Sequence, residues 1–282
     1  MGHLDHAAFG ALTPALSFLA AAVGGALGLR CTVRALAATG RARRNWLATA
    51  ASALATGIWT MHFVAMLGFD VQGTRIRYDV PLTLLSLLVA LLVVGAGLFC
   101  VCHGGGRTAP LLAGGLATGL GVAGMHYLGM AALRLHGTVH YDPLLVALSV
   151  SVAVAAATAA LWAAVHISSP AAVAGASLVM GAAVSSMHYT GMLAVSVEVD
   201  PSTAPLGGAS ALQFIFPLAV GLGSYLFVTC AFVALSPTAA QRAEHAPPPR
   251  GTGERSAVPA GGGGGEPVPR APREAAGRPG RG

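Results

Sequence analysis

Long apolar stretches separated by short polar segments make up residues 1–235 of the chain. A helix needs about 20 mostly apolar residues to cross a bilayer. Seven stretches reach this length without an Asp, Glu or Arg, namely residues 8–29, 46–69, 81–102, 109–133, 143–165, 171–195 and 211–235. The N-terminal segment lacks the positive charges of a signal peptide, so the first stretch is predicted to be a retained helix. The pattern therefore predicts an all-α membrane protein with seven transmembrane helices.

The composition agrees with a protein whose main solvent is lipid. Hydrophobic residues make up 55% of the chain and charged residues 9%, whereas soluble domains carry about 25% charged residues. This excludes an ordinary water-soluble protein and predicts a multi-pass protein of the plasma membrane. The formal net charge is +6, but no basic patch sits on a soluble domain, so we expect no nucleic-acid partner.

Arginines near the first polar segment predict the orientation of the chain in the membrane. Five of them follow the first apolar stretch, namely Arg30, Arg34, Arg41, Arg43 and Arg44. Because positively charged loops stay in the cytoplasm, this segment is predicted to lie inside, with the N-terminus outside and the C-terminus inside. Arg75, Arg77 and Arg134 depart from this trend, because the same topology places them outside.

The composition changes at Ser236, and Pro, Gly, Arg and Glu dominate from there on. Such a segment cannot bury enough apolar area to offset the entropy lost on ordering. We therefore expect a membrane domain over residues 1–235 and a disordered cytoplasmic tail over residues 236–282. This division leaves no room for a catalytic domain, so we expect no enzymatic activity.

A repeat runs through the apolar region. Three hexapeptides, at residues 61–66, 125–130 and 187–192, share the pattern M-H-[FY]-x-[AG]-M, and they contain six of the eight methionines. Their histidines are 64 and 62 residues apart, which is about one helical hairpin. Tyr-Asp-Pro and Leu-Ser pairs recur on the alternate helices. The repeat predicts three tandem two-helix units plus a seventh helix.

The repeated residues are soft-to-borderline metal ligands. Imidazole and thioether groups together suit copper, with thioether favouring Cu(I) and imidazole favouring Cu(II). The absence of a carboxylate from the apolar stretches argues against magnesium, manganese and a di-iron site. The three His–Met pairs are predicted at one depth near the outer face. They could meet on a common axis, or each could serve its own site.

Other interpretations of the motif stay open. The histidines could form hydrogen-bonded helix contacts only, with the Gly or Ala of each motif allowing close packing. Pairs of histidines on facing helices could ligate haem. A third alternative is copper uptake or delivery, in which the Cys-Val-Cys-His run at residues 100–103 marks the inner end of a route.

Polar residues beside the motifs have predicted supporting roles. Tyr127 and Tyr189 directly follow their histidines and are candidate hydrogen-bond partners of a cofactor site. Asp79, Asp142 and Asp200 each stand at or just before a proline near a predicted helix start. We expect these three aspartates to cap helices.

At these residues the chain resembles the MHYT-domain family of bacterial integral membrane sensor proteins. Residues 187–190 spell the tetrapeptide itself, while the first copy carries Phe63 and Val64 and the second carries Leu128. The resemblance covers most of residues 8–235. It implies a sensory input module with a copper site near the outer membrane face and with oxygen, carbon monoxide or nitric oxide as the sensed ligand.

The resemblance also implies a ligand set and a partner. Carried over to this sequence, the candidate copper ligands are Met61, His62, Met66, Met125, His126, Met130, Met187, His188 and Met192. The first copy has Phe63 where the other two copies have tyrosine, so it lacks the hydroxyl group. Because many family members fuse this module to a cytoplasmic signalling enzyme, the resemblance implies a separate cytoplasmic signalling protein as partner here.

Overall fold

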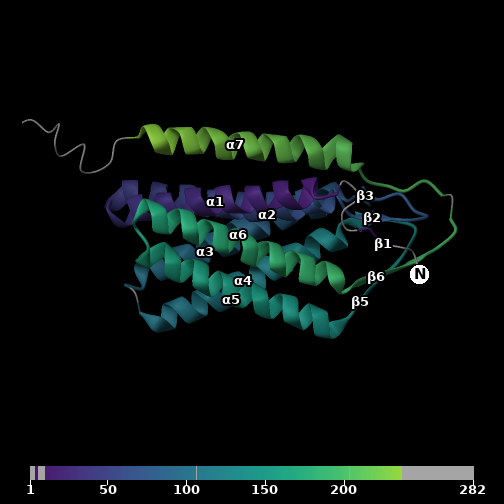
Figure 1. Ribbon diagram of the computed structural model, residues 1–282, viewed down its shortest axis with the longest axis horizontal. Coiled ribbons are helices and arrows are strands. Elements are labelled where there is room, and N and C mark those ends of the chain that lie inside the picture. The colour runs from purple at the N-terminus through teal and green to yellow at the C-terminus, as the bar shows by residue number, and fades with distance from the viewer. Residues whose placement is uncertain (1–3, 6–9, 106, 203, 237–282) are drawn as a thin grey trace, which may run out of the picture. The chain divides into compact units, whose positions relative to one another are not determined.

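The computed structural model describes residues 4–5, 10–105, 107–202 and 204–236, and this part of the chain contains seven long helices (Figure 1). Their bounds are α1 Leu12–Leu36, α2 Gly40–Met66, α3 Val80–His103, α4 Thr108–Ala131, α5 Pro143–His166, α6 Pro170–Leu193 and α7 Phe216–Leu235. A π-helical turn, Ala211–Ile215, leads into α7. All seven are long and apolar enough to cross a membrane. The prediction of seven transmembrane helices is confirmed.

The first two helices extend further than their apolar stretches. Arg30 and Arg34 lie in the last turns of α1, and Arg41, Arg43 and Arg44 lie in the first turns of α2. The prediction of a loop over these residues was wrong because apolarity marks only the part of a helix inside the hydrocarbon. Arginine side chains reach the headgroup region while their backbone stays helical.

The first six helices form a closed ring. Each packs against its neighbours in the chain, and α6 closes the ring by packing against α1. The seventh helix lies against α1 and α2 (Figure 1). The ring places α2, α4 and α6, which carry the repeated motif, in equivalent positions.

Three short antiparallel strand pairs lie together at one end of the bundle, here called the strand end (Figure 1). They are β1 Leu4–Asp5 with β2 Asp70–Val71, β3 Arg77–Tyr78 with β4 Leu133–Arg134, and β5 Gly137–Tyr141 with β6 Val195–Val199. In each pair, the strand before the first helix of a hairpin meets the strand after the second. Each repeat is therefore a strand–helix–helix–strand unit, which confirms the three tandem two-helix repeats.

Aspartates cap the N-termini of two helices, as predicted. The Asp79 carboxylate accepts a hydrogen bond from the backbone N–H of Leu82 at the start of α3, and Asp142 caps α5 in the same way. The prediction for Asp200 was wrong, because no helix among the described residues begins directly after it, and the next helical segment begins at Ala211. Ser210 caps the next helical segment instead, in a capping box with Gln213.

The Asp79 cap also forms an ion pair across the β3–β4 strands. Arg134 Nη2 lies 2.6 Å from Asp79 Oδ2. This hydrogen bond to Arg134, followed by the one from Leu82, lowers the pKa of Asp79 below its ordinary value. The unfolded carboxyl group has a pKa of about 4. Because the pKa of Asp79 is lower in the folded protein, the ion pair contributes its full stability at pH values above about 4. This contribution is lost as the pH falls through the pKa of Asp79 in the folded state.

We therefore expect Arg134→Gln to reduce the acid sensitivity of folding. The variant should be less stable than the wild type at neutral pH, and its thermal unfolding midpoint should fall less as the pH drops from about 5 to about 3. The measurement is a pH series of melting curves in detergent. Parallel curves for both proteins would contradict a stabilising role for the pair.

The end of α7 is tied to the first hairpin at the end of the bundle opposite the strands. Arg34 Nη2 donates to the carbonyl oxygens of Val233 and Ser236, at 2.6 and 3.0 Å. Its guanidinium carbon lies 5.1 Å from the ring centroid of Trp46. These contacts hold the C-terminal end of α7. The predicted disordered tail lies outside the described residues from residue 237 on.

Candidate metal centre

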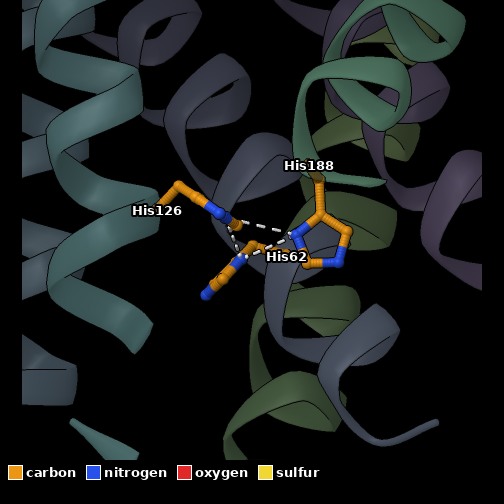
Figure 2. A group of neighbouring side chains, drawn as sticks. All are labelled: His62, His126 and His188. Carbon is orange, nitrogen blue, oxygen red and sulfur yellow. Dashed lines mark hydrogen bonds between the residues drawn. The ribbon is translucent and has the colours of Figure 1, made fainter. Parts of the chain in front are cut away.

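The three motif histidines meet at one point inside the bundle. Figure 2 shows His62, His126 and His188 pointing toward one another from α2, α4 and α6. Their Nδ1 atoms are separated by 3.0 Å (His62–His188), 3.1 Å (His62–His126) and 3.3 Å (His126–His188). All three side chains are buried, with at most 1% of each exposed. Of the two arrangements left open by the spacing, the common axis is the one observed.

The glycine of the motif makes room for this convergence. A Cβ atom at Gly129 would lie 2.5 Å from Nε2 of His62, and one at Gly191 would lie 2.5 Å from Nε2 of His126. The imidazoles of His62 and His126 thus each rest on the helix backbone of the next repeat. The motif therefore pairs a histidine that points to the axis with a small residue that admits its neighbour's ring.

The three Nδ1 atoms cannot all be paired by hydrogen bonds among themselves. A neutral ring nitrogen carries either a proton or a lone pair in the ring plane, so it is either donor or acceptor. Among three mutually contacting Nδ1 atoms, at least one pair must place two protons or two lone pairs face to face. In addition, Nε2 of His62 and of His126 is buried without a hydrogen-bond partner among the described residues. The face-to-face contact of the Nδ1 atoms costs free energy unless something else occupies the centre, and the Nε2 atoms stay unpartnered in either case.

A metal ion fits the centre of the cluster. Atoms 3.0 to 3.3 Å apart can all lie about 2 Å from one point just outside their plane, and imidazole–metal distances are about 2.0–2.1 Å. An ion at that point would accept all three lone pairs. Among the described residues, one group of three or more His, Cys, Asp or Glu side chains has ligand atoms that lie close enough to share a metal. This group is the histidine triad. Its donors are three imidazole nitrogens.

The six motif methionines fall into two groups around the histidines. Met66, Met130 and Met192 gather with apolar strand residues such as Val71 and Val197 in one buried cluster toward the strand end. Met61, Met125 and Met187 are also buried, each with at most 1% exposed. All six methionines are thus buried on the three helices that carry the triad, and the role of each sulfur as a ligand stays a prediction.

The two motif tyrosines support their histidines through ring contacts. The ring of Tyr127 meets His126 edge-on at 4.7 Å, and that of Tyr189 meets His188 at 5.0 Å between centroids. The Tyr127 hydroxyl hydrogen-bonds to Ser149 Oγ at 2.6 Å, away from the triad. The Tyr189 hydroxyl is buried without a hydrogen-bond partner among the described residues. The cofactor-binding roles of both tyrosines stay predictions.

The recurring Leu-Ser pairs prove to be anchors for the motif helices. Ser149 of α5 holds Tyr127, and Ser86 of α3 accepts a hydrogen bond of 2.9 Å from Trp59 Nε1 of α2. Trp59 supplies in the first copy the polar contact that Phe63 cannot make. Sequence reasoning recognised the serines only as a repeat. The signal for their role was the recurrence of a small polar residue at one position of otherwise apolar helices.

The Cys-Val-Cys-His run does not form a comparable site. Cys100 is exposed and Cys102 buried, so the two thiols do not share one environment. His103 Nδ1 hydrogen-bonds to the carbonyl oxygen of Phe99 one turn earlier. The run therefore gives no support to a metal route ending at these residues.

Comparisons with known proteins agree with the repeat. The family model "MHYT: Bacterial signalling protein N terminal repeat" matches residues 56–114, 119–177 and 181–243. The bifunctional diguanylate cyclase/cyclic di-GMP phosphodiesterase MucR of Pseudomonas aeruginosa is 42% identical over 185 residues, which are 64% of this chain and 27% of MucR. The signaling protein YkoW of Bacillus subtilis is 29% identical over 221 residues, 74% of this chain and 26% of YkoW.

A third relative has the same pattern of coverage. The cyclic di-GMP phosphodiesterase NbdA of Pseudomonas aeruginosa is 39% identical over 169 residues, 58% of this chain and 21% of NbdA. The chain thus spans about a fifth to a quarter of the length of these curated relatives. No solved structure matches the chain.

Proposed function

Because the chain belongs to the MHYT family of bacterial signalling proteins, we propose that this membrane sensory module binds one copper ion through His62, His126 and His188. The observation that carries the proposal is the mutual contact of three buried Nδ1 atoms at 3.0 to 3.3 Å. Hydrogen bonds among the three histidines cannot pair all three Nδ1 atoms, whereas a cation at their centre can bind all three lone pairs. Met66, Met130 and Met192 are the candidate thioether ligands on its strand-end side.

Charge and donor type favour Cu(I) over a divalent ion. The cluster holds no carboxylate or thiolate among the described residues, so the full charge of the metal would remain uncompensated inside a membrane protein. The cost of burying an ion rises steeply with its charge, so a monovalent ion is buried at a lower cost than a divalent one. Thioether and imidazole donors bind Cu(I) well. Each histidine would then bind the copper through the lone pair on its Nδ1 atom.

The stimulus that we propose is a diatomic gas or a change of redox state at the copper. Three protein nitrogens leave room for a further small ligand. MucR and NbdA are named for making or degrading cyclic di-GMP. By analogy, we propose that the module passes its state through α7 to a cytoplasmic signalling protein of that kind, with the module itself not catalytic.

Metal analysis of the purified protein tests the copper site. The wild type, purified in detergent and loaded with Cu(I) under reducing conditions, is expected to hold about one copper per chain. His126→Ala should lower the affinity by about 100-fold or more, because it removes one of three ligands. His140→Ala is the matched control, since this histidine is exposed and pairs only with Glu198; its copper content should equal that of the wild type.

Two outcomes would overturn the site. One is the absence of bound copper in the wild type, and the other is equal copper content in the wild type and the His62→Ala/His126→Ala/His188→Ala variant. An optical spectrum of the same sample tests the haem alternative through its Soret band. The geometry favours a small ion, because a porphyrin cannot be inserted between nitrogens in mutual contact. Copper handling instead of sensing would appear as altered cellular copper content in a deletion strain.

A further inference from the structure

The strand end gathers arginines that the charge pattern of the membrane protein leaves unexplained. Arg75, Arg77 and Arg134 are the three that the predicted orientation places outside, against the tendency of cations to stay in the cytoplasm. The strand pair β3–β4 sets Arg77 directly opposite Arg134. Like charges at opposite positions of a strand pair are destabilising. The arrangement therefore needs a compensating group of negative charge.

Among the described residues, a carboxylate pairs with one of these three cations. Asp79 pairs with Arg134. Arg77 donates from Nε and Nη2 to the carbonyl oxygen of Gly208, at 2.9 and 2.6 Å, which holds its position but does not neutralise its charge. The Arg75 side chain is exposed and makes no hydrogen bond or ion pair with the described residues. Two guanidinium groups thus remain without an anionic partner there.

Arg75 and Arg77 both line one groove. It has a volume of about 690 Å³, and its other lining residues are Gly73, Thr74, His136, Ser202, Ala204, Pro205 and Leu206. Thr74 Oγ1 accepts a hydrogen bond of 2.9 Å from the backbone N–H of His136, which ties two of these segments together. No carboxylate of the described residues lines the groove. Its volume falls within the range of about 300–1,000 Å³ typical of small-molecule sites.

We propose that this groove binds a phosphate group, carried either by a lipid headgroup or by a small soluble molecule. Guanidinium groups bind phosphate oxygens through paired, charge-assisted hydrogen bonds. Arg75 offers all its N–H donors, and Arg77 offers those that Gly208 does not use. Arg77 precedes the first residue of α3 by three positions, so the groove lies near the level of the headgroups. The proposal does not depend on copper binding.

Two binding experiments separate the possible sources of the phosphate. Calorimetric titration of the detergent-purified full chain with glycerol phosphate tests a soluble ligand. Native mass spectrometry after release from nanodiscs tests a lipid, with phosphatidylglycerol compared against phosphatidylcholine. We expect the wild type to bind in at least one arm, and the arm that responds identifies the source.

Arginine variants tie the binding to the groove. Arg75→Gln should weaken binding by about tenfold through the loss of charge-assisted hydrogen bonds. The variant should fold, because this side chain makes no described hydrogen bond; an unchanged helical circular dichroism spectrum checks this. Arg44→Gln is the matched control, since Arg44 is exposed on α2 at the opposite end of the bundle. Its binding should equal that of the wild type.

The proposal fails if the wild type binds neither glycerol phosphate nor phosphatidylglycerol in preference to phosphatidylcholine. It also fails if Arg44→Gln weakens binding as much as Arg75→Gln, because the effect would then reflect net charge and not the groove. Copper content, measured on the same samples, should be the same in all three proteins. A loss of copper binding with phosphate binding intact would affect only the proposed function.

Discussion

Replacing Gly191 with Ala is expected to lower the affinity for Cu(I) by about 10- to 100-fold, the effect typical of disturbing a group that orients a metal ligand. The new Cβ atom would lie 2.5 Å from Nε2 of His126. Real Cβ atoms do not approach other atoms so closely, so the imidazole must move. Its Nδ1 would then leave the common centre. Gly129→Ala should act in the same way through His62. Competition with a chromophoric Cu(I) chelator measures both affinities.

Gly124 provides a matched control on the same helix as Gly129. A Cβ atom there meets nothing within 4 Å, and alanine stabilises a helix by about 1 kcal/mol relative to glycine. Gly124→Ala should therefore bind Cu(I) like the wild type and unfold at the same or a higher temperature. If Gly191→Ala and Gly124→Ala had equal affinities, the glycine would be a packing residue with no influence on the metal centre.

The repeat explains how much of the site was predictable. Spacings of 64 and 62 residues were enough to place the three histidines at one depth on equivalent helices. The choice between one site and three depended on the closure of the ring by α6 against α1. That contact joins segments about 150 residues apart, and no local pattern records it. The role of Gly129 and Gly191 was hidden for the same reason, since each admits a ring from another repeat.

The features that the sequence did not predict share a physical cause. Hydropathy reports which residues prefer lipid, so it located seven helices but not the arginine-bearing ends of α1 and α2. The strands β1 to β6 are only 2 to 5 residues long. Most of them are too short to show an alternation of apolar and polar residues, and β6, which does alternate, follows directly on the apolar stretch of α6. Asp200 looked like a cap because Pro201 follows it, yet a cap requires a helix to begin there, and the helix begins ten residues later at Ala211.

Gly57→Ala is expected to destabilise the bundle by about 1–3 kcal/mol, the usual cost of overpacking. A Cβ atom at Gly57 of α2 would lie 2.8 Å from Cα of Gly24 in α1 and 3.0 Å from the carbonyl oxygen of Ala20. These are backbone atoms, so no change of rotamer can relieve the contact. The two helices must separate along their shared interface. Unfolding in mixed detergent and SDS micelles, followed by circular dichroism, measures the loss.

The sign of the effect distinguishes this contact from helix propensity. Gly175 of α6 has nothing within 4 Å of its potential Cβ atom, so Gly175→Ala should gain up to about 1 kcal/mol from propensity alone. Gly57→Ala receives the same gain and should still be less stable than the wild type. A Gly57→Ala protein as stable as Gly175→Ala would mean that α1 and α2 are free to move apart. Because α2 carries His62 and α1 closes the ring, that freedom would leave the histidine triad without a rigid support.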